Sequence, residues 1–161
     1  MRENFKSMAD TFYQVYLQFV FAVRNRRKLI PKSRKDELHK YITGLVQNRG
    51  SKMIAVHCMP DHAHIFVGFR PGSMKISDFV KEIKLASNTF INNNRLCEGH
   101  FQWQNGYGVF SYSHSHIDRV AKYVLNQEVH HRVKSFQSEY LEFLERFNVP
   151  YNEKYLFDFF E

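Results

Sequence analysis

The sequence predicts an α+β protein in which strands and helices follow the order β-α-β-β-α-β and form one antiparallel sheet, with additional helices at the C-terminal end. Three observations support this prediction. A chain of 161 residues has the length of one domain. Its 43% hydrophobic and 16% aromatic content suffices for a buried core without disulfides or a structural metal. Its apolar residues switch along the chain between strand-like alternation and helical spacing.

The first strand is predicted at residues 12–23, where aromatic and β-branched residues alternate. One of its faces carries Tyr13, Val15, Leu17, Phe19 and Phe21. A helix follows, with Ser33 as its expected N-cap and the Asn48-Arg49-Gly50 segment at its end. Its apolar stripe has the spacing of a helix that packs on a sheet and consists of Leu38, Tyr41, Ile42, Leu45 and Val46.

The middle of the chain predicts a strand, a turn, a second strand and a helix. Residues 52–58 and 62–69 are the strands, joined by a turn at Pro60-Asp61. Ser77 is expected to cap the helix, whose apolar stripe is Phe79, Ile83, Ala86 and Phe90. A fourth strand is predicted at residues 106–112. This order is the split, ferredoxin-like arrangement also found in RNA-recognition (RRM-like) domains, with both helices expected on one face of the sheet.

Two more amphipathic helices are predicted, at residues 116–131 and 136–147. We expect residues 1–161 to form one domain, with residues 135–161 as a C-terminal extension made of the last helix and a tail. The tail is rich in aromatic residues, whose exposure to water would be costly. It is therefore expected to pack on its own domain or on a second subunit.

Positive charge is concentrated in the first half of the chain. Residues 1–80 hold 14 Lys and Arg against 6 Asp and Glu, whereas residues 81–161 hold 9 against 10. An anionic partner is therefore expected to bind the first half. The densest cluster suits contact with nucleic-acid phosphates but also fits a solvated loop, and it consists of Arg24, Arg26, Arg27, Lys28, Lys32, Arg34 and Lys35.

Neither a membrane span nor a secretory signal is readable in the sequence. No apolar run reaches the roughly 18 residues of a membrane helix, and the N-terminal segment lacks the apolar stretch of a signal peptide. We therefore expect a cytoplasmic protein. Cys58 and Cys97 lie far apart without a CxxC motif, so we interpret them as buried reduced thiols rather than as a disulfide or a metal site.

The predicted strand 62–69 carries the strongest candidate for chemistry. His62 and His64 lie two residues apart, so both imidazoles point to the same face while the alternate residues face the core. Two such imidazoles can converge on one cation, although an isolated His-x-His also occurs on solvated sheet faces. Tyr123 and Gln127 lie one helical turn apart on the predicted helix 116–131, which brings a phenol and an amide oxygen together.

Four segments together carry a resemblance to a known family. They are PDHAHIFVGF from Pro60, Lys84 in the following helix, WQNGYGVFS from Trp103 and YVLNQEVHH from Tyr123. In this combination, over about residues 12–134, the sequence resembles the insertion-sequence 200/605-type (IS200-like) single-tyrosine transposases of the HUH endonuclease superfamily.

The resemblance implies both a site and an activity. His62 and His64 match the histidines that bind a divalent cation, Mg²⁺ or Mn²⁺. Gln127 matches the third metal-ligand position, and Tyr123 matches the catalytic tyrosine. The family nicks and rejoins single-stranded DNA at hairpin-bearing element ends through a 5′-phosphotyrosine intermediate. It works as homodimers, in which the tyrosine helix of one subunit often meets the histidines of the other.

Several residues keep two interpretations. Asp61 either orients the neighbouring imidazole or only shapes the turn. Lys84 either contacts DNA, as the resemblance implies, or is a solvated lysine. Trp103, Tyr107 and Phe110 can stack on unpaired bases, but we expect them in the core or in a dimer interface.

Two features of the predicted site stay open. No dedicated base for Tyr123 is identified, and we interpret His130, which lies near the same helical face, as a surface histidine. Where many relatives carry a histidine in the first strand, this chain has Leu17-Gln18-Phe19. We do not expect this departure to disable the site.

Three alternatives to an active transposase are considered. One is a domesticated enzyme that nicks hairpin repeats of the host. Another is a non-catalytic single-stranded nucleic-acid-binding protein whose sheet aromatics stack on bases. The third is a zinc site of His57, Cys58, His62 and His64, which is disfavoured because His57 and Cys58 face opposite sides of a strand.

Overall fold

The computed structural model describes residues 11–24, 29–72 and 74–159. Three members of the predicted basic cluster, Arg26, Arg27 and Lys28, lie outside the described residues. Within the described ranges, no helix is both long enough and apolar enough to cross a membrane.

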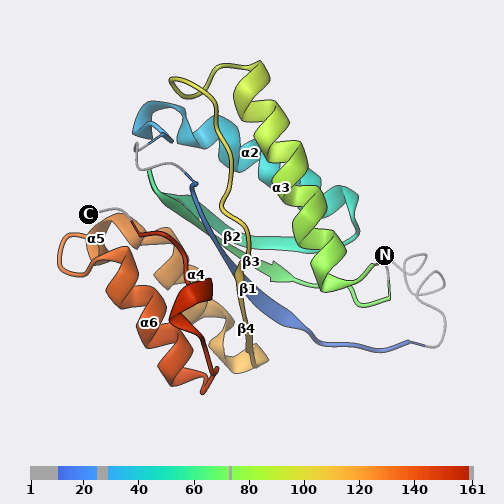
Figure 1. The fold of residues 1–161 in the computed structure, drawn as a ribbon. Coiled ribbons are helices and arrows are strands. Elements are labelled where there is room, and N and C mark those ends of the chain that lie inside the picture. The colour runs from blue at the N-terminus through green and yellow to red at the C-terminus, as the bar shows by residue number, and fades with distance from the viewer. Residues whose placement is uncertain (1–10, 25–28, 73, 160–161) are drawn as a thin grey trace.

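A four-stranded antiparallel sheet forms the centre of the protein (Figure 1). Its strands are β1 (Tyr16–Ala22), β2 (Lys52–Cys58), β3 (His62–Gly68) and β4 (Gly108–Tyr112). They lie in the order β2-β3-β1-β4, and each neighbouring pair is antiparallel. This is the sheet of a ferredoxin-like fold, so the predicted fold class and the order of the elements are confirmed.

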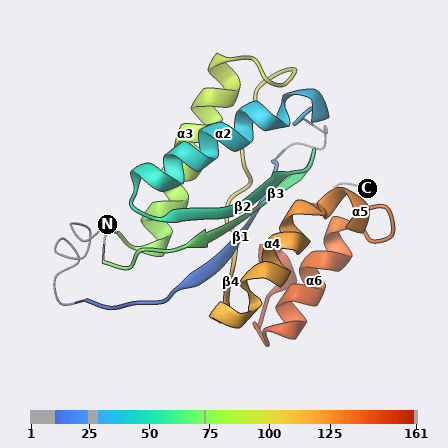
Figure 2. The same ribbon diagram turned by 180° about the vertical axis from the view of Figure 1, so that it is seen from behind.

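One face of the sheet packs against α2 (Lys35–Asn48) and α3 (Ile76–Asn93), as Figures 1 and 2 show. The β1 and β3 side chains in this core include Phe19, Phe21, Ala63, Ile65 and Val67. Both cysteines are free thiols. Cys58 is buried in this core and Cys97 packs against it half-buried.

The opposite face packs against α4 (Ile117–Leu125), α5 (Gln127–His130) and α6 (Phe136–Arg146), as both views show. The helices thus divide between the faces, with the predicted pair on one and the C-terminal helices on the other. Because β3 is covered on both sides, His62 and His64 are only 1% and 0% exposed. The interpretation of these histidines as residues of a solvated face is therefore wrong.

Two of the predicted strands are longer than the observed ones. β1 begins at Tyr16 rather than at residue 12, because its pairing with both neighbours ends there, opposite Gly68 and Tyr112. β4 begins at Gly108, which pairs with Val20, rather than at residue 106. A strand lasts only as long as its neighbours supply hydrogen bonds, and the alternation of side chains does not contain that information.

The predicted helix caps are wrong. Ser33 lies inside a short 3-10 helix, η1 (Lys32–Arg34), and Ser77 lies inside α3. The N-cap residues are instead Arg34 for α2 and Lys75 for α3, and neither makes a capping hydrogen bond through its side chain. The first turn of α2 instead carries the acidic residues Asp36 and Glu37, which interact favourably with the positive end of the helix dipole.

The predicted helix 116–131 is not continuous. A short 3-10 helix, η2 (His114–His116), leads into α4, and Asn126 separates α4 from α5 with a φ of −98° and a ψ of 23°. Asparagine is suited to such a position because its side chain competes with helical hydrogen bonding. Gln127, the first residue of α5, is fully buried after this break.

The described part of the C-terminal tail packs on its own domain, one of the two predicted placements. After a 3-10 helix, η3 (Glu153–Tyr155), the ring of Phe157 is buried 4.8 Å from that of Tyr140. The Gln104 side chain donates a hydrogen bond to the Asp158 carbonyl (2.7 Å) and accepts one from its amide (2.8 Å). These contacts attach the tail beside α6.

Candidate active site

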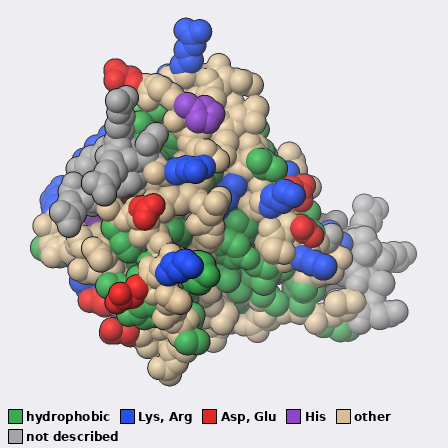
Figure 3. Space-filling model, in the orientation of Figure 1, with side chains coloured by type: hydrophobic (Ala, Val, Ile, Leu, Met, Phe, Trp, Pro, Cys, Tyr) green, Lys and Arg blue, Asp and Glu red, His purple; other side chains and the backbone are tan. Residues whose placement is uncertain are grey.

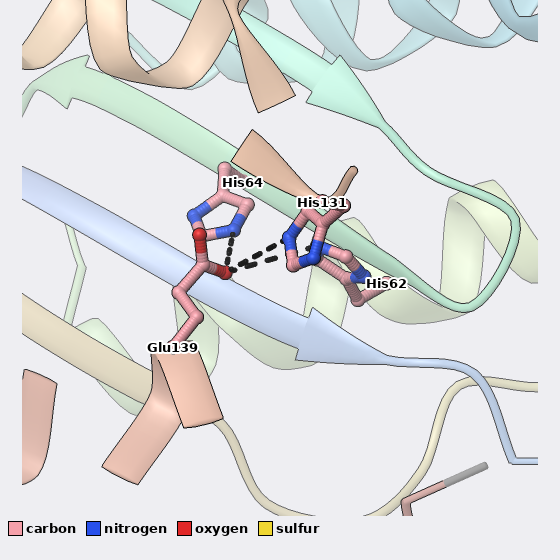
Figure 4. A group of neighbouring side chains, drawn as sticks. All are labelled: His62, His64, His131 and Glu139. Carbon is pink, nitrogen blue, oxygen red and sulfur yellow. Dashed lines mark hydrogen bonds and ion pairs between the residues drawn. The ribbon is translucent and has the colours of Figure 1, made fainter. Parts of the chain in front are cut away.

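Three imidazoles and one carboxylate converge between β3 and the C-terminal helices (Figure 4). His62 and His64 come from β3, His131 follows α5, and Glu139 lies on α6. One oxygen of Glu139, Oε1, lies 3.0 Å from Nε2 of His64, 3.3 Å from that of His131 and 3.9 Å from that of His62. One ligand atom from each of the four residues lies within 4.8 Å of the others, so the group could bind a metal ion.

The other nitrogen of each imidazole contacts an oxygen. Nδ1 of His62 lies 2.7 Å from Oδ1 of Asp61, and Nδ1 of His64 lies 2.7 Å from Oε1 of Gln18. Nδ1 of His131 lies 2.8 Å from the carbonyl oxygen of Lys134. Because all three partners are hydrogen-bond acceptors, each Nδ1 carries a proton in the neutral ring. The lone pair of each Nε2 therefore faces Glu139.

This arrangement places hydrogen-bond acceptor atoms next to one another, so positive charge between them is needed to stabilise it. Nε2 lone pairs of neutral imidazoles and an ionised carboxylate repel one another unless a proton or a metal cation lies between them. Burial alone would raise the pKa of Glu139. When protons rather than a metal lie between these groups, the charge of His64 and the hydrogen bonds that His131 and His64 then donate hold this pKa well below its usual range. Burial lowers the pKa of His64, whereas for His131 contact with Glu139 outweighs burial and raises it. The donor set thus fits a divalent cation.

Tyr123 and Gln127 join this group despite the break at Asn126. The Tyr123 hydroxyl donates a hydrogen bond to Oε2 of Glu139. Oε1 of Gln127 lies 2.9 Å from Nε2 of His131 and 3.3 Å from that of His62. The structure therefore brings together the four residues that the sequence analysis placed in the site.

The environment of Tyr123 favours the protonated phenol. Burial raises the pKa of this side chain, and the neighbouring Glu139 carboxylate raises it further through its charge and its hydrogen bond. The ring of His130, which was interpreted as a surface residue, is half-buried and lies 4.7 Å from the Tyr123 ring. The phenol is thus held between an imidazole ring and a carboxylate.

Sequence reasoning missed three residues of the site, namely Gln18, His131 and Glu139. Glu139 had a readable signal, since it lies three residues after Phe136 and four before Phe143 and so falls on the apolar stripe of its helix. His131 lies four residues after Gln127 and shares its face of the chain. Gln18 was noted only as a departure from the family pattern, yet it is fully buried and also donates a hydrogen bond to the Tyr112 hydroxyl (2.8 Å).

The described members of the basic cluster mostly have partners within the chain. Arg24 donates to Gln102 (3.1 Å), Arg34 is paired with Glu37 (2.9 Å), and Lys35 contacts Glu128 (2.5 Å). Lys32 is exposed. On the face shown in Figure 3, Lys and Arg side chains are spread over several elements rather than gathered in one patch.

Lys84 and Trp103 lie on the side of the sheet that α2 and α3 cover, whereas Phe110 packs on the α6 side. The Lys84 ammonium donates to the carbonyls of Gln104 (2.8 Å) and Gly106 (2.5 Å), and burial lowers the pKa of this lysine to about 8. Lys84 thereby fixes the segment that leads into β4. Trp103 and Phe110 are 2% and 3% exposed, so they are core residues, as we expected, and not stacking platforms.

The alternative zinc site is not assembled. Cys58 is buried in the core beneath α2 and α3, on the opposite side of the sheet from the converging imidazoles. The ring of His57 lies 5.4 Å from that of His39, and its Nε2 is 3.9 Å from Glu128. Among the described residues, the histidines of β3 therefore join His131 and Glu139 rather than His57 and Cys58.

Comparisons with known proteins agree on one family. The family model described as "Transposase IS200 like" matches residues 11–127. The ISDra2 transposase TnpA of Deinococcus radiodurans is 27% identical over 120 residues, which cover 71% of this chain and 85% of that protein.

Two solved structures share the fold. A crystal structure from Deinococcus radiodurans R1, assigned as a transposase, aligns with a TM-score of 0.57 and 23% identity over 73% of this chain and 94% of that one. A REP-associated tyrosine transposase bound to a REP hairpin aligns with a TM-score of 0.56 and 19% identity over 75% and 72%. Since the family model covers most of the chain and the fold agrees, the protein belongs to the IS200-like transposase family.

Proposed function

We propose that the protein is a metal-dependent, single-stranded DNA transposase that nicks and rejoins DNA at hairpin-bearing element ends through a 5′-phosphotyrosine intermediate. The observation that carries the proposal is the hydrogen bond from the Tyr123 hydroxyl to Glu139, the same carboxylate on which three imidazoles converge. A nucleophile beside a group that can hold a metal is what this reaction requires. Membership of the IS200-like family supports the same chemistry.

The metal ligands proposed from the sequence are His62, His64 and Gln127, and His131 and Glu139 extend this set. A divalent cation there, Mg²⁺ or Mn²⁺, would act as a Lewis acid that orients the scissile phosphate and stabilises charge on the leaving 3′ oxygen. A set rich in imidazole suits Mn²⁺ better than Mg²⁺, which prefers oxygen ligands. Asp61 and Gln18 are positioning residues, because each holds one imidazole through Nδ1.

Tyr123 is the proposed nucleophile. Its phenolic oxygen forms a bond to phosphorus while the bond from phosphorus to the 3′ oxygen breaks, and water protonates that oxygen. Because the phenol is protonated at neutral pH, its proton must leave during attack, and Oε2 of Glu139 already accepts its hydrogen bond. Glu139 therefore supplies the proton acceptor that the sequence alone did not reveal. A later 3′-hydroxyl can reverse the step and join strands.

The proposed partners are single-stranded DNA hairpins and a second copy of the chain. Hairpin binding is supported by the related REP-associated transposase, which is bound to a REP hairpin. The basic residues Arg24, Arg26, Arg27, Lys28, Lys32, Arg34, Lys35 and Lys84 remain the predicted DNA contacts. Tyr123 and the histidines meet within one chain here, so a homodimer would contain a complete set in each subunit. We place the reaction in the cytoplasm.

A denaturing gel tests the proposal. The full chain is incubated with labelled single strands that flank its coding region, with Mg²⁺ or Mn²⁺ or with a chelator. We expect a covalent protein–DNA adduct that requires the metal and is absent for Tyr123→Phe and for His64→Ala. Tyr107→Phe, which removes a phenol on the other side of the sheet, serves as the matched control and should still form the adduct.

Two results would contradict the proposal. One is an adduct that persists in Tyr123→Phe, which would make another residue the nucleophile. The other is the absence of an adduct with every strand tested while binding persists, which would favour the non-catalytic binding protein. A domesticated nickase would form the same adduct, but with hairpin repeats dispersed in the host genome.

A further inference from the structure

A cavity of about 580 Å³ opens beside Tyr123, between β4, α4 and α6. Its volume lies within the range of about 300–1,000 Å³ that is usual for small-molecule sites. Four aromatic rings line it, those of Tyr112, Tyr123, Phe143 and Phe147. The rings of Tyr112 and Phe147 are in edge-to-face contact, with centroids 5.4 Å apart, so two neighbouring aromatic side chains form one corner of the cavity.

The charge around this cavity suits an anion with an apolar part. Arg119 of α4 and Arg146 of α6 line it and are exposed, and the described lining contains no carboxylate. Arg146 also lines a second cavity of about 310 Å³, which shares Tyr123 and Phe143 with the first. The nucleophile therefore stands at the junction of two hollows, with one arginine common to both.

We propose that the larger cavity binds one unpaired base of the DNA strand, next to the phosphate that Tyr123 attacks, and that Arg146 contacts the adjoining phosphate. This inference rests on the proposed function. Bases stack on aromatic side chains without regard to sequence, and arginine pairs with phosphate oxygens. Phe143, Arg146 and Phe147 follow the residues matched by the family model, which end at position 127, so this base pocket is built in part by the C-terminal extension of this chain.

An abasic scan tests the base pocket. The probe is a fluorescein-labelled DNA hairpin from the sequence flanking the coding region, with a single-stranded tail in which each nucleotide in turn is made abasic. Affinity for the full chain is measured by fluorescence anisotropy in a chelator, so that no cleavage occurs. We expect one tail position at which loss of the base weakens binding, by roughly fivefold to a hundredfold.

Substitution of Phe147 links that position to the cavity. Phe147→Leu keeps an apolar side chain but removes the aromatic face, whereas Phe147→Tyr keeps the face. In Phe147→Leu the penalty for the abasic position should shrink, because the base has already lost its stacking partner, and in Phe147→Tyr it should stay as in the wild type. Thermal unfolding of both variants checks that they are folded.

Arg146→Gln tests the phosphate contact. Binding of every tail should weaken, and the slope of log affinity against log salt should fall by about one. Lys40→Gln removes the same charge from α2, on the far side of the sheet, and should leave both quantities unchanged. An unchanged slope in Arg146→Gln would overturn the assignment of this residue.

The outcomes separate this inference from the proposed function. If the wild type forms the metal-dependent adduct but no abasic position matters, or if the penalty is the same in Phe147→Leu, the base pocket is refuted while the transposase activity stands. If no adduct forms with any strand but the abasic penalty appears and shrinks in Phe147→Leu, the pocket is supported and the nicking mechanism is refuted.

Discussion

On one face of the sheet, beneath α2 and α3, the side chains of β3 are Ala63, Ile65 and Val67, whereas on the other face, beneath α4 to α6, two of them are histidines. The burial is nearly the same, since all of these residues are at most 1% exposed. Burial of the aliphatic residues stabilises the fold, but burial of an imidazole costs free energy unless its polar atoms are paired. One strand therefore supplies a core on one side and a preorganised site on the other.

The largest effect on stability is expected on the aliphatic face. Ile65→Ala should lower the free energy of unfolding by about 2–5 kcal/mol, because it removes buried methyl groups and leaves a cavity. It should leave Mn²⁺ affinity unchanged, since its side chain points away from the histidines. Denaturant unfolding and calorimetric metal titration measure the two quantities. If Ile65→Ala lost as much Mn²⁺ affinity as His64→Ala, the two faces of the sheet would not have separate roles in stability and metal binding.

On the histidine face, Glu139→Gln should affect metal binding more than stability. We expect Mn²⁺ affinity to fall by more than tenfold, because a charged ligand is replaced by a neutral amide. The free energy of unfolding should change less than in Ile65→Ala, since the amide can donate a hydrogen bond to an Nε2 lone pair. Glu142→Gln is the matched control, because this carboxylate lies one helical turn further along α6, is exposed and pairs with Lys134 instead of the histidines. Equal Mn²⁺ affinity in both variants would remove Glu139 from the ligand set.

A smaller loss is expected when an imidazole loses the partner of its Nδ1. Gln18→Leu removes the oxygen that holds Nδ1 of His64, so the ring is no longer fixed in one tautomer. Mn²⁺ affinity should fall by about tenfold, the lower end of the range for such partners. Gln18→Glu keeps an acceptor and should retain affinity. If Gln18→Leu binds Mn²⁺ as the wild type does, the contact has no positioning role.

The smallest expected effect is the pH dependence of stability set by Tyr123. Its pKa is raised in the folded protein, so as pH rises above about 10 the unfolded chain loses this proton first and the free energy of unfolding decreases. Tyr123→Phe should remove part of that decrease. Other buried groups contribute to the rest, among them Tyr112 and Tyr140, whose pKa burial raises to about 12, and the thiols of Cys58 and Cys97, whose pKa burial raises to about 12 and about 11.

Denaturant unfolding between pH 8 and 11 in the absence of metal measures this effect. Tyr107→Phe, which removes a phenol away from Glu139, is the variant with which Tyr123→Phe is compared. A steeper alkaline decrease in Tyr123→Phe than in the wild type would mean that the folded environment favours the phenolate, contrary to the geometry described above.

The order of the elements could be predicted because period and length are local properties. Alternation along 62–69 and the helical stripes of α2 and α3 were sufficient for the fold class. Helix caps and strand ends depend instead on tertiary neighbours, which explains why Ser33 and Ser77 were misassigned and why β1 is shorter than predicted. The break at Asn126 was also missed, because the apolar stripe continues through it.

Short-range patterns in the sequence identified only some of the residues of the site. The pairs His62 with His64 and Tyr123 with Gln127 are each readable from spacing. Glu139 reaches them only because α6 docks against the sheet, where the ring of Tyr140 packs so close to Gly108 that a Cβ there would lie 2.8 Å from it. Such a long-range contact cannot be predicted from the local sequence. The position of Glu139 within an apolar stripe is nevertheless unusual and indicates a candidate functional residue.

We propose that the imidazoles of His62, His64 and His131, together with Glu139, hold a divalent metal next to Tyr123. Electron paramagnetic resonance of Mn²⁺ titrated into the metal-free full chain reports on these ligands. We expect one ion per chain, with electron spin-echo modulation from imidazole nitrogens that weakens in His64→Ala and in His131→Ala. Mn²⁺ that binds without nitrogen modulation, or modulation unchanged in both variants, would contradict it.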